Sequence, residues 1–166
     1  MSNADGDAGK AYNAAINYIA YRARSEAEVL SKLREKEYAE NVIGGVIERL
    51  KQYDYINDEK FCEMYIHDKS KVSGFGRERI MEGLINLGVD YATAEKCLDE
   101  AGLDEEDAAL KLLSKRYKNG LPFETDEYSD DFLKEKKKAV DFLLRKGYTP
   151  ETAVEAFKRL LNEKSY

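Results

Sequence analysis

The sequence predicts an all-α fold, a tandem array of three-helix repeats. Apolar residues recur at helical spacing along almost the whole chain, and no stretch of alternating β-branched residues indicates a sheet. One apolar pattern also occurs three times, which is typical of a repeat protein. With 166 residues, of which 43% are hydrophobic, the chain is long enough to bury an ordinary core.

The three copies of the pattern align without internal gaps. They are "VLSKLREKEYAENVIGGVIERL" from Val29, "IMEGLINLGVDYATAEKCLDEA" from Ile80 and "AVDFLLRKGYTPETAVEAFKRL" from Ala139. Each copy predicts two amphipathic helices joined by a tight turn, and a further amphipathic helix precedes each copy. Neighbouring repeats are expected to bury each other's edges. We therefore expect repeats at 11–55, 56–103 and 104–166, after an expression scar that forms a disordered tail at 1–10.

The turn inside each repeat has a chemical explanation. Gly147 stands where a helix end favours a left-handed residue, and Thr149 is a suitable N-cap for the helix that follows. Gly88 takes the place of Gly147 in the second repeat. The first repeat has Glu37 and Ala39 at the corresponding positions, so we expect its turn to be the weakest, by about 1 kcal/mol.

Other features limit the classes of protein to which this sequence can belong. The segment 119–131 is expected to be a mobile acidic loop, and it has no metal-loop pattern. Cys62 and Cys97 are expected to be half-buried thiols of a reducing compartment. No apolar run approaches the roughly 18 residues of a membrane span, and no signal segment opens the chain. We therefore expect a cytoplasmic protein that does not enter a membrane.

Motifs of catalysis and of cofactor binding are missing from the sequence. His67 is the single histidine, and its place near a predicted helix end suggests a surface side chain. No GxxxxGK[ST] loop, no GxGxxG after a strand and no Cys/His metal spacing occurs. Carboxylates alternate with Lys and Arg, which is typical of solvated helix faces. The sequence thus predicts a binding module without a cofactor and not an enzyme.

A net charge of −6 argues against a protein that coats nucleic acid, so any polyanion contact must be local. The first of two candidate clusters contains Arg22, Arg24, Lys32 and Arg34. Ser25 and Glu28, within this cluster, have the spacing of a capping box, which would fill the helix start with the protein's own carboxylate. Two interpretations of these basic residues stay open. They contact a partner, or their charges are merely solvated or stabilised near the C-terminus of the preceding helix.

The second candidate cluster contains Lys69, Lys71, Arg77 and Arg79. The two arginines fall in the first turn of a predicted helix, where each opposes the helix macrodipole by about 0.3–1 kcal/mol. Glycines at 74 and 76 are expected to leave the backbone amides accessible, as in an anion site at a helix start. We therefore rank this cluster above the first as the contact for a carboxylate or phosphate.

Four segments, in order, resemble the RecX family of bacterial recombination regulators over nearly all of 12–164. They are "YIAYRARSEAEVLSKLREKEY", "YINDEKFCEMYIHDKSK", "GRERIMEGLINLGV" and "AVDFLLRKGYTPETAVEAFKRL". The resemblance implies a curved and elongated array of three helix-turn-helix-like three-helix repeats, and we expect a monomer. The family's matching basic positions are the eight residues of the two clusters. Glu37 departs from the glycine usual in that turn, and the acidic net charge departs from many basic members.

The resemblance implies that the partner is the RecA filament on single-stranded DNA. Binding there would modulate or inhibit the ATPase, strand-exchange and coprotease activities of RecA, and so regulate recombination and DNA repair. Weak binding to single- or double-stranded DNA is also implied, although the acidic charge puts it in more doubt than RecA binding.

Two other readings stay open. A helix-turn-helix DNA-binding regulator would need Arg, Asn or Gln on an outward helix face. The predicted second helices instead present Gly44, Gly45 and Glu48 in the first repeat. Each glycine there costs about 1 kcal/mol of helix stability, and close backbone packing and sequence drift both explain the pair. A generic helical scaffold is the third reading.

Overall fold

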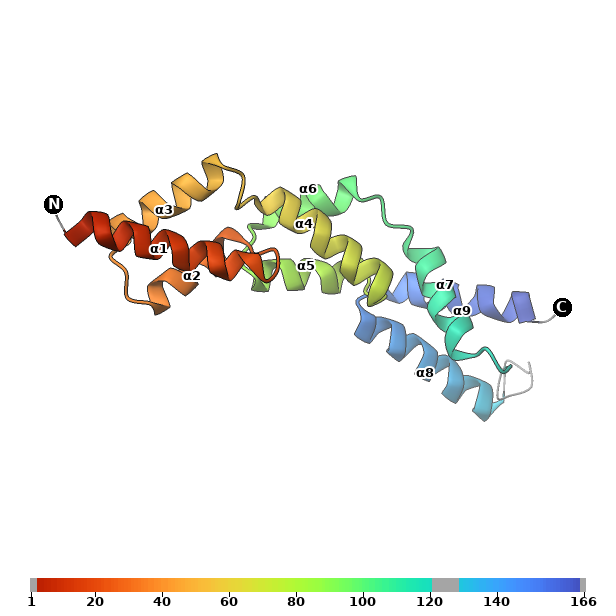
Figure 1. Ribbon diagram of the computed structural model, residues 1–166. Coiled ribbons are helices and arrows are strands. Elements are labelled where there is room, and N and C mark those ends of the chain that lie inside the picture. Colours follow the sequence, from red (N-terminus) through yellow and green to blue (C-terminus); the bar gives the residue numbers. More distant parts are fainter. Residues whose placement is uncertain (1–2, 121–128, 165–166) are drawn as a thin grey trace. The chain divides into compact units, whose positions relative to one another are not determined.

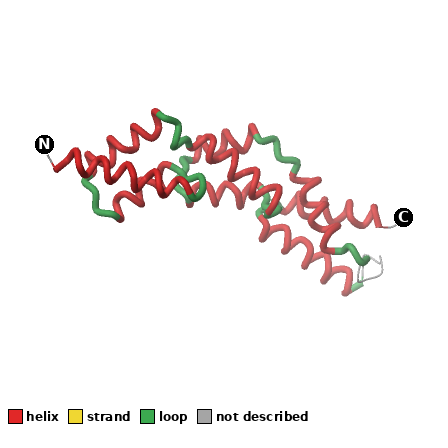
Figure 2. The backbone as a smooth tube through the Cα atoms, in the orientation of Figure 1, coloured by secondary structure: helices red, strands yellow, loops and turns green. Residues whose placement is uncertain are grey.

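The computed structural model describes residues 3–120 and 129–164, and within these ranges it contains nine α-helices and no strand (Figures 1 and 2). The helices are α1 Asn3–Ala20, α2 Glu26–Glu35, α3 Glu40–Gln52, α4 Asp58–His67, α5 Arg77–Asn86, α6 Tyr91–Glu100, α7 Glu105–Arg116, α8 Asp130–Lys146 and α9 Pro150–Lys164. A π-helical segment, Asp68–Val72, directly continues α4. The all-α prediction is confirmed for the described chain.

The chain divides into two compact units. Unit 1 is Met1–Tyr65 with Gly83–Cys97, and unit 2 is Ile66–Glu82 with Leu98–Tyr166. The division passes through the middle repeat, α4 to α6. Unit 1 therefore contains the junction between the first and second repeats, and unit 2 contains the junction between the second and third.

Unit 1 has its core where α1, α2 and α3 pack on one another (Figure 1). Val29 and Leu33 of α2, four residues apart, are 0% exposed, and Leu50 of α3 is also 0% exposed. Among residues 6–20 of α1 the buried ones are Ala11 and Ala15, which allow its backbone to lie close to the other two helices. Replacing one of the large core residues by alanine is expected to cost about 2–5 kcal/mol.

Unit 2 has its core where α9 packs against α7 and α8. The ring of Phe132 meets that of Phe157 edge to face, with centroids 5.9 Å apart and planes at 67°. Leu143 and Leu160 are 0% exposed, and Tyr148 is 1% exposed. Leu143, Phe157 and Leu160 belong to the repeated apolar pattern, which explains why the pattern identified the fold.

The turns within the repeats follow the sequence prediction. Gly147 has φ +89° and Gly88 has φ +82°, so both adopt the left-handed conformation expected at a helix end. Thr149 Oγ1 accepts a hydrogen bond from the N–H of residue 152 over 3.2 Å, as an N-cap does. In the first repeat Glu37 takes the same left-handed conformation, with φ +60°, and Ala39 makes no side-chain cap.

Two expectations concern segments next to residues that the structure does not describe. Helix α1 begins at Asn3 and so includes residues 3–10, which we expected to belong to a disordered tail. Two alanines and two aspartates among residues 3–10 favour helix there, against the two glycines of the same segment. The expected acidic loop at 119–131 lies mostly outside the described residues, because 121–128 are not among them.

Candidate functional site: two basic clusters at the repeat junctions

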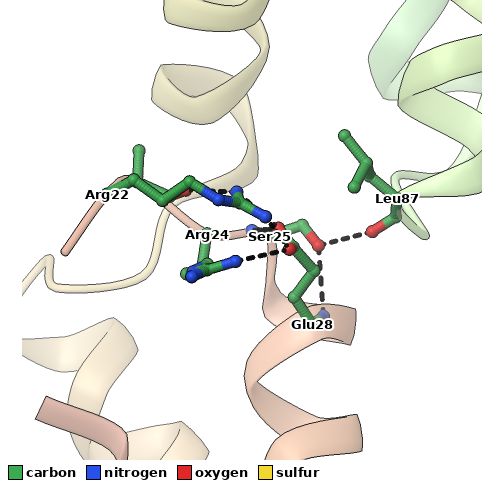
Figure 3. Close-up of polar contacts among 6 residues, drawn as sticks. Arg22, Arg24, Ser25, Glu28 and Leu87 are labelled. Atoms are coloured by element: carbon green, nitrogen blue, oxygen red, sulfur yellow. Dashed lines mark hydrogen bonds and ion pairs between the residues drawn. The ribbon is translucent and has the colours of Figure 1, made fainter. Parts of the chain in front are cut away.

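Two members of the first basic cluster, Arg22 and Arg24, contact the carboxylate of Glu28 at the start of α2 (Figure 3). Arg22 Nη2 lies 2.5 Å from Glu28 Oε1, and Arg24 Nη1 lies 3.2 Å from the same oxygen. The N–H of Ser25 donates to Glu28 Oε2 over 3.2 Å, and the N–H of Glu28 donates to Ser25 Oγ over 3.2 Å. The predicted capping box is confirmed. The protein's own carboxylate thus occupies the position that an external phosphate would need.

The surroundings of Glu28 keep it ionised. Burial opposes ionisation, but hydrogen bonds from Arg22, the Ser25 N–H and Arg24 outweigh it and lower the pKa of Glu28 below its usual value. The guanidinium of Arg24 lies over the Tyr18 ring, 4.0 Å from its centroid. The Arg24 side chain is 15% exposed, whereas that of Arg22 is 48% exposed. Arg24 is therefore mainly a structural residue, and Arg22 is the member of the pair that can reach a partner.

The start of α2 also binds the second repeat within unit 1. The hydroxyl of Ser25 donates to the carbonyl oxygen of Leu87 over 2.5 Å (Figure 3). The N–H of Glu26 donates to Asp58 Oδ1, at the start of α4, over 2.8 Å. Burial raises the pKa of Asp58, although the Glu26 N–H opposes this shift. Ser25 is 0% exposed. This helix start is therefore a joint between repeats and is closed to a ligand.

Of the other two basic residues of the first cluster, Arg34 is exposed, whereas Lys32 is half-buried, with its Nζ 5.9 Å from the centroid of the Tyr18 ring. Lys32 Nζ lies 2.9 Å from Glu35 Oε2. Arg34 makes a two-pronged contact with Glu40, with its Nε and Nη2 donating over 2.7 and 2.9 Å. Exposed pairs of this kind contribute only about 0–1 kcal/mol, so both cations can change partner at little cost.

The arginines of the second cluster lie at the start of α5. Within unit 2, residues of the third repeat accept the hydrogen bonds of the backbone N–H groups at this helix start. The N–H of Gly76 donates to the carbonyl oxygen of Lys146 over 2.8 Å. The N–H of Arg77 donates to Glu105 Oε1 over 2.7 Å, and the following N–H, of residue 78, donates to the carbonyl oxygen of Gly147 over 3.2 Å. The expectation of accessible backbone amides is therefore wrong, because this helix start already has its acceptors.

The glycine at position 76 has a packing explanation. A Cβ there would lie 2.4 Å from the carbonyl oxygen of Gly147 and 2.8 Å from the nitrogen of Tyr148. Both are backbone atoms that cannot move aside without shifting the turn. Gly76 thus allows two backbones to approach, and it does not open a cradle for an anion.

The two arginines of this cluster are engaged inside unit 2. Arg77 Nη2 lies 2.6 Å from Asp99 Oδ1, and the Arg77 side chain is 35% exposed. Arg79 donates to the carbonyl oxygen of Arg145 and lies over the Phe75 ring, 4.3 Å from its centroid. These contacts offset the unfavourable macrodipole, so our reason for ranking this cluster above the first no longer applies.

Lys69 and Lys71 belong to the π-helical segment Asp68–Val72. Such segments are rare and are frequently found at functional sites. Lys69 Nζ lies 3.2 Å from Asp68 Oδ2, and Lys71 is exposed. Lys71 also lines a groove along α7 that includes Lys111 and Lys115. Lys69 is 29% exposed, so Lys71 is the more accessible of the two lysines.

Sequence reasoning missed two carboxylates that organise these junctions. Asp58 and Glu105 are the first residues of α4 and α7, the first helices of the second and third repeats. Asp58 accepts from the N–H of Glu26, and Glu105 accepts from the N–H of Arg77. The available signal was an acidic residue at the same helical position in consecutive repeats.

The remaining chemistry is limited. Among the residues that the structure describes, no group of three or more His, Cys, Asp and Glu could hold a metal ion. His67 is exposed.

Cys62 and Cys97 form no disulfide and are buried, more deeply than we expected, and burial raises the pKa of Cys62 to about 12. Within the described ranges, no helix is both long and apolar enough to cross a membrane.

The three repeats match three domains of one known family. Residues 11–50 match the family model of the RecX first three-helix domain, 57–98 that of the second and 104–157 that of the third. The structure is similar to the crystal structure of RecX from Lactobacillus salivarius, with a TM-score of 0.78, 28% identity and coverage of 94% of this chain and 97% of the other. Three tandem three-helix domains are therefore shown.

Similar sequences carry the name regulatory protein RecX. The protein from Clostridium perfringens strain 13 is 36% identical over 154 residues, which are 92% of this chain and 69% of that protein. The one from Clostridium acetobutylicum is 32% identical over 152 residues, 90% of this chain and 68% of that protein. The one from Bacillus velezensis is 34% identical over 143 residues, 86% of this chain and 52% of that protein.

Proposed function

Since the chain belongs to the RecX family of regulatory proteins, we propose that it binds the RecA recombinase filament on single-stranded DNA. Bound there as a monomer in the cytoplasm, it modulates or inhibits the ATPase, strand-exchange and coprotease activities of RecA. It thereby regulates recombination and DNA repair. The observation that carries the proposal is the match of all three family domains, in order, to the repeats of this chain.

The eight basic residues divide into two roles in this proposal. Arg24 and Arg77 are engaged within their own repeats, with Glu28 and Asp99, and Arg79 contacts the carbonyl oxygen of Arg145 across a junction. These three residues act on the partner through the positions of their neighbours. Direct contacts come from Arg22, Arg34 and Lys71, which are exposed, and from Lys32 and Lys69, which are half-buried. Exposed cations contribute mainly to the rate and selectivity of association with an acidic surface.

A helix-turn-helix DNA-binding regulator is the alternative, and the exposed faces of the second helices weigh against it. Glu48 of α3 and Glu95 and Asp99 of α6 are exposed on these helices. Carboxylates at such positions repel phosphates and accept hydrogen bonds mainly from cytosine among the bases. A protein partner is therefore favoured over a major groove.

The test is the ATPase activity of RecA on single-stranded DNA with increasing amounts of this protein. We expect loss of activity near one protein per few RecA subunits, and a parallel loss of strand exchange. DNA binding is measured beside it at moderate salt. No effect on RecA from the matched organism, together with tight binding to duplex DNA, would contradict the proposal and support the alternative.

A charge reversal tests the contact residues. Lys69→Glu with Lys71→Glu is expected to weaken inhibition roughly tenfold, because two attractive contacts become repulsive. Lys134→Glu is the matched control, since Lys134 of α8 is 67% exposed and belongs to neither cluster. Equal inhibition by both variants would remove the π-helical segment from the interface.

A further inference from the structure

The middle of α3 carries a pair of glycines whose side-chain space is empty. Gly44 and Gly45 are exposed, and a Cβ at either position would meet no heavy atom within 4 Å. Neither has a positive φ. Glycine weakens a helix interior relative to alanine because it loses more conformational freedom on folding. Neither backbone conformation nor packing within the described chain therefore accounts for the pair.

A groove of about 580 Å³ in unit 1 includes the two glycines. Its apolar part is formed mainly by Leu30 of α2, because Ile43 and Ile47 of α3, which also line it, are only 1% and 6% exposed. Its charged part is formed by Glu26, Glu40, Glu48 and Lys51. Without side chains at 44 and 45, the α3 backbone is accessible to close approach by another chain. The glycines and the apolar residues are thus parts of one surface.

The charge of this groove indicates what can bind it. Lys51 Nζ lies 2.8 Å from Glu26 Oε2, and Glu40 is paired with Arg34 outside the groove. Glu48 is exposed beside Gly44 and Gly45. With three carboxylates against one ammonium, the lining is acidic. It repels phosphates and attracts lysine or arginine.

We propose that this groove binds a segment of a protein partner that presents apolar side chains flanked by lysine or arginine. The apolar side chains cover Leu30, the cations meet Glu48 and Glu40, and the segment's backbone lies close to Gly44 and Gly45. An amphipathic helix in an apolar groove is a common mode of such recognition. The inference rests on the proposed function in one respect, that the partner is a protein.

The direct test uses a synthetic amphipathic peptide of about four helical turns, with leucines on one face and lysines beside them. A peptide with glutamates in place of the lysines is its counterpart. Amide resonances of Gly44 and Gly45 are followed by NMR. We expect the lysine peptide to shift both resonances and the glutamate peptide to leave them in place. Unmoved resonances, or equal shifts with both peptides, would overturn the proposal.

The variant Gly44→Ala with Gly45→Ala separates binding from stability. Because alanine favours a helix and finds open space here, we expect a higher melting temperature. We also expect the affinity for the lysine peptide to fall about tenfold, because the methyl groups occupy the approach path. Gly9→Ala in α1 is the matched control, since Gly9 is equally open, and it should leave affinity unchanged. A stabilised double variant with unchanged affinity would show that the glycines are sequence drift.

Inhibition of the RecA ATPase distinguishes this proposal from the proposed function. Peptide binding at Gly44 and Gly45 without any effect on RecA would support the groove and contradict the RecA assignment. If the native protein inhibits RecA but the peptide leaves the glycine resonances in place, the RecA assignment is supported and the groove proposal is contradicted. Weaker inhibition by the stabilised double variant would support both.

Discussion

The junction in unit 1 and the junction in unit 2 make the same contact with different chemistry. In unit 1 the hydroxyl of Ser25 donates to the carbonyl oxygen of Leu87, whereas in unit 2 the N–H of Gly76 donates to the carbonyl oxygen of Lys146. The donors occupy the same repeat position, and so do the acceptors. One joint between repeats is thus built from a side chain and the other from two backbones that approach closely.

The carboxylates at the two helix starts also come from different sources. In unit 1 Glu28 of α2 itself caps the helix, and Asp58 of the next repeat accepts a second N–H. In unit 2 the position of Glu28 is taken by Arg79, and Glu105 of the next repeat is the carboxylate at the helix start. Both helices therefore have an anion at the positive end of the macrodipole. An arginine-rich helix start next to a glycine is consequently no evidence for an external ligand.

The largest expected effect comes from breaking the joint in unit 2. Gly76→Ala should lower the free energy of unfolding by about 3 kcal/mol, because the methyl group would overlap the backbone of residues 147 and 148. Urea unfolding followed by circular dichroism measures the change. Ser25→Gly, the opposite exchange, removes the hydroxymethyl side chain without creating an overlap and should cost about half as much or less. Equal costs would contradict the different construction of the two joints.

The next largest loss of stability is expected from Glu28, because the corresponding helix start in unit 2 has Arg79 in its place. Glu28→Gln should cost about 2 kcal/mol at neutral pH, because the poorly exposed Arg24 loses its charged partner. The pKa of Glu28 is lowered in the folded protein, so its contribution is present above the usual pKa of a glutamate and is lost as pH falls through the folded pKa. The difference between native protein and variant should therefore shrink below about pH 4.

A matched control for this experiment is Glu35→Gln. Glu35 forms an exposed pair with Lys32, so its loss should cost less than about 0.5 kcal/mol. If both variants lost the same stability, the ring of donors around Glu28 would have no special value.

The capping box shows what could be predicted from sequence, and Gly76 shows what could not. Ser25 and Glu28 are three residues apart, so their contact depends on local spacing that the sequence displays directly. The acceptors of Gly76 and Arg77 lie 70 and 28 residues away, in contacts that only the fold creates. A glycine at a helix start has the same appearance in sequence whether an anion or a neighbouring backbone fills the space. The repeat was predictable because its apolar spacing is local, and the two arginine roles were not.

A smaller effect is expected from the hydroxyl in unit 1. Ser25→Ala removes both the N-cap acceptor and the donor to Leu87, at about 1–2 kcal/mol. Ser25→Thr keeps the hydroxyl and is the control, although its extra methyl group must fit a residue that is 0% exposed. Urea midpoints for both variants measure the effect. A loss below about 0.5 kcal/mol for alanine would show that water replaces the link to Leu87.

The smallest expected effect concerns the turns, where the first repeat has Glu37 and the third has Gly147. Both residues are left-handed, with φ of +60° and +89°. Because a side chain is unfavourable in this conformation, Glu37→Gly should raise the free energy of unfolding by up to about 1 kcal/mol. Asp54→Gly is the comparison, since Asp54 has φ +58° but also binds Lys60 and Asn57.

Asp54→Gly relieves the same backbone strain but also loses the contacts of Asp54 with Lys60 and Asn57. Its gain in the free energy of unfolding should therefore be smaller than that of Glu37→Gly. Thermal unfolding of the two variants ranks them. A gain at position 54 that equals the gain at position 37 would mean that the exposed contacts of Asp54 contribute nothing. A loss at position 37 would mean that the greater freedom of glycine in the unfolded chain outweighs the strain that is relieved.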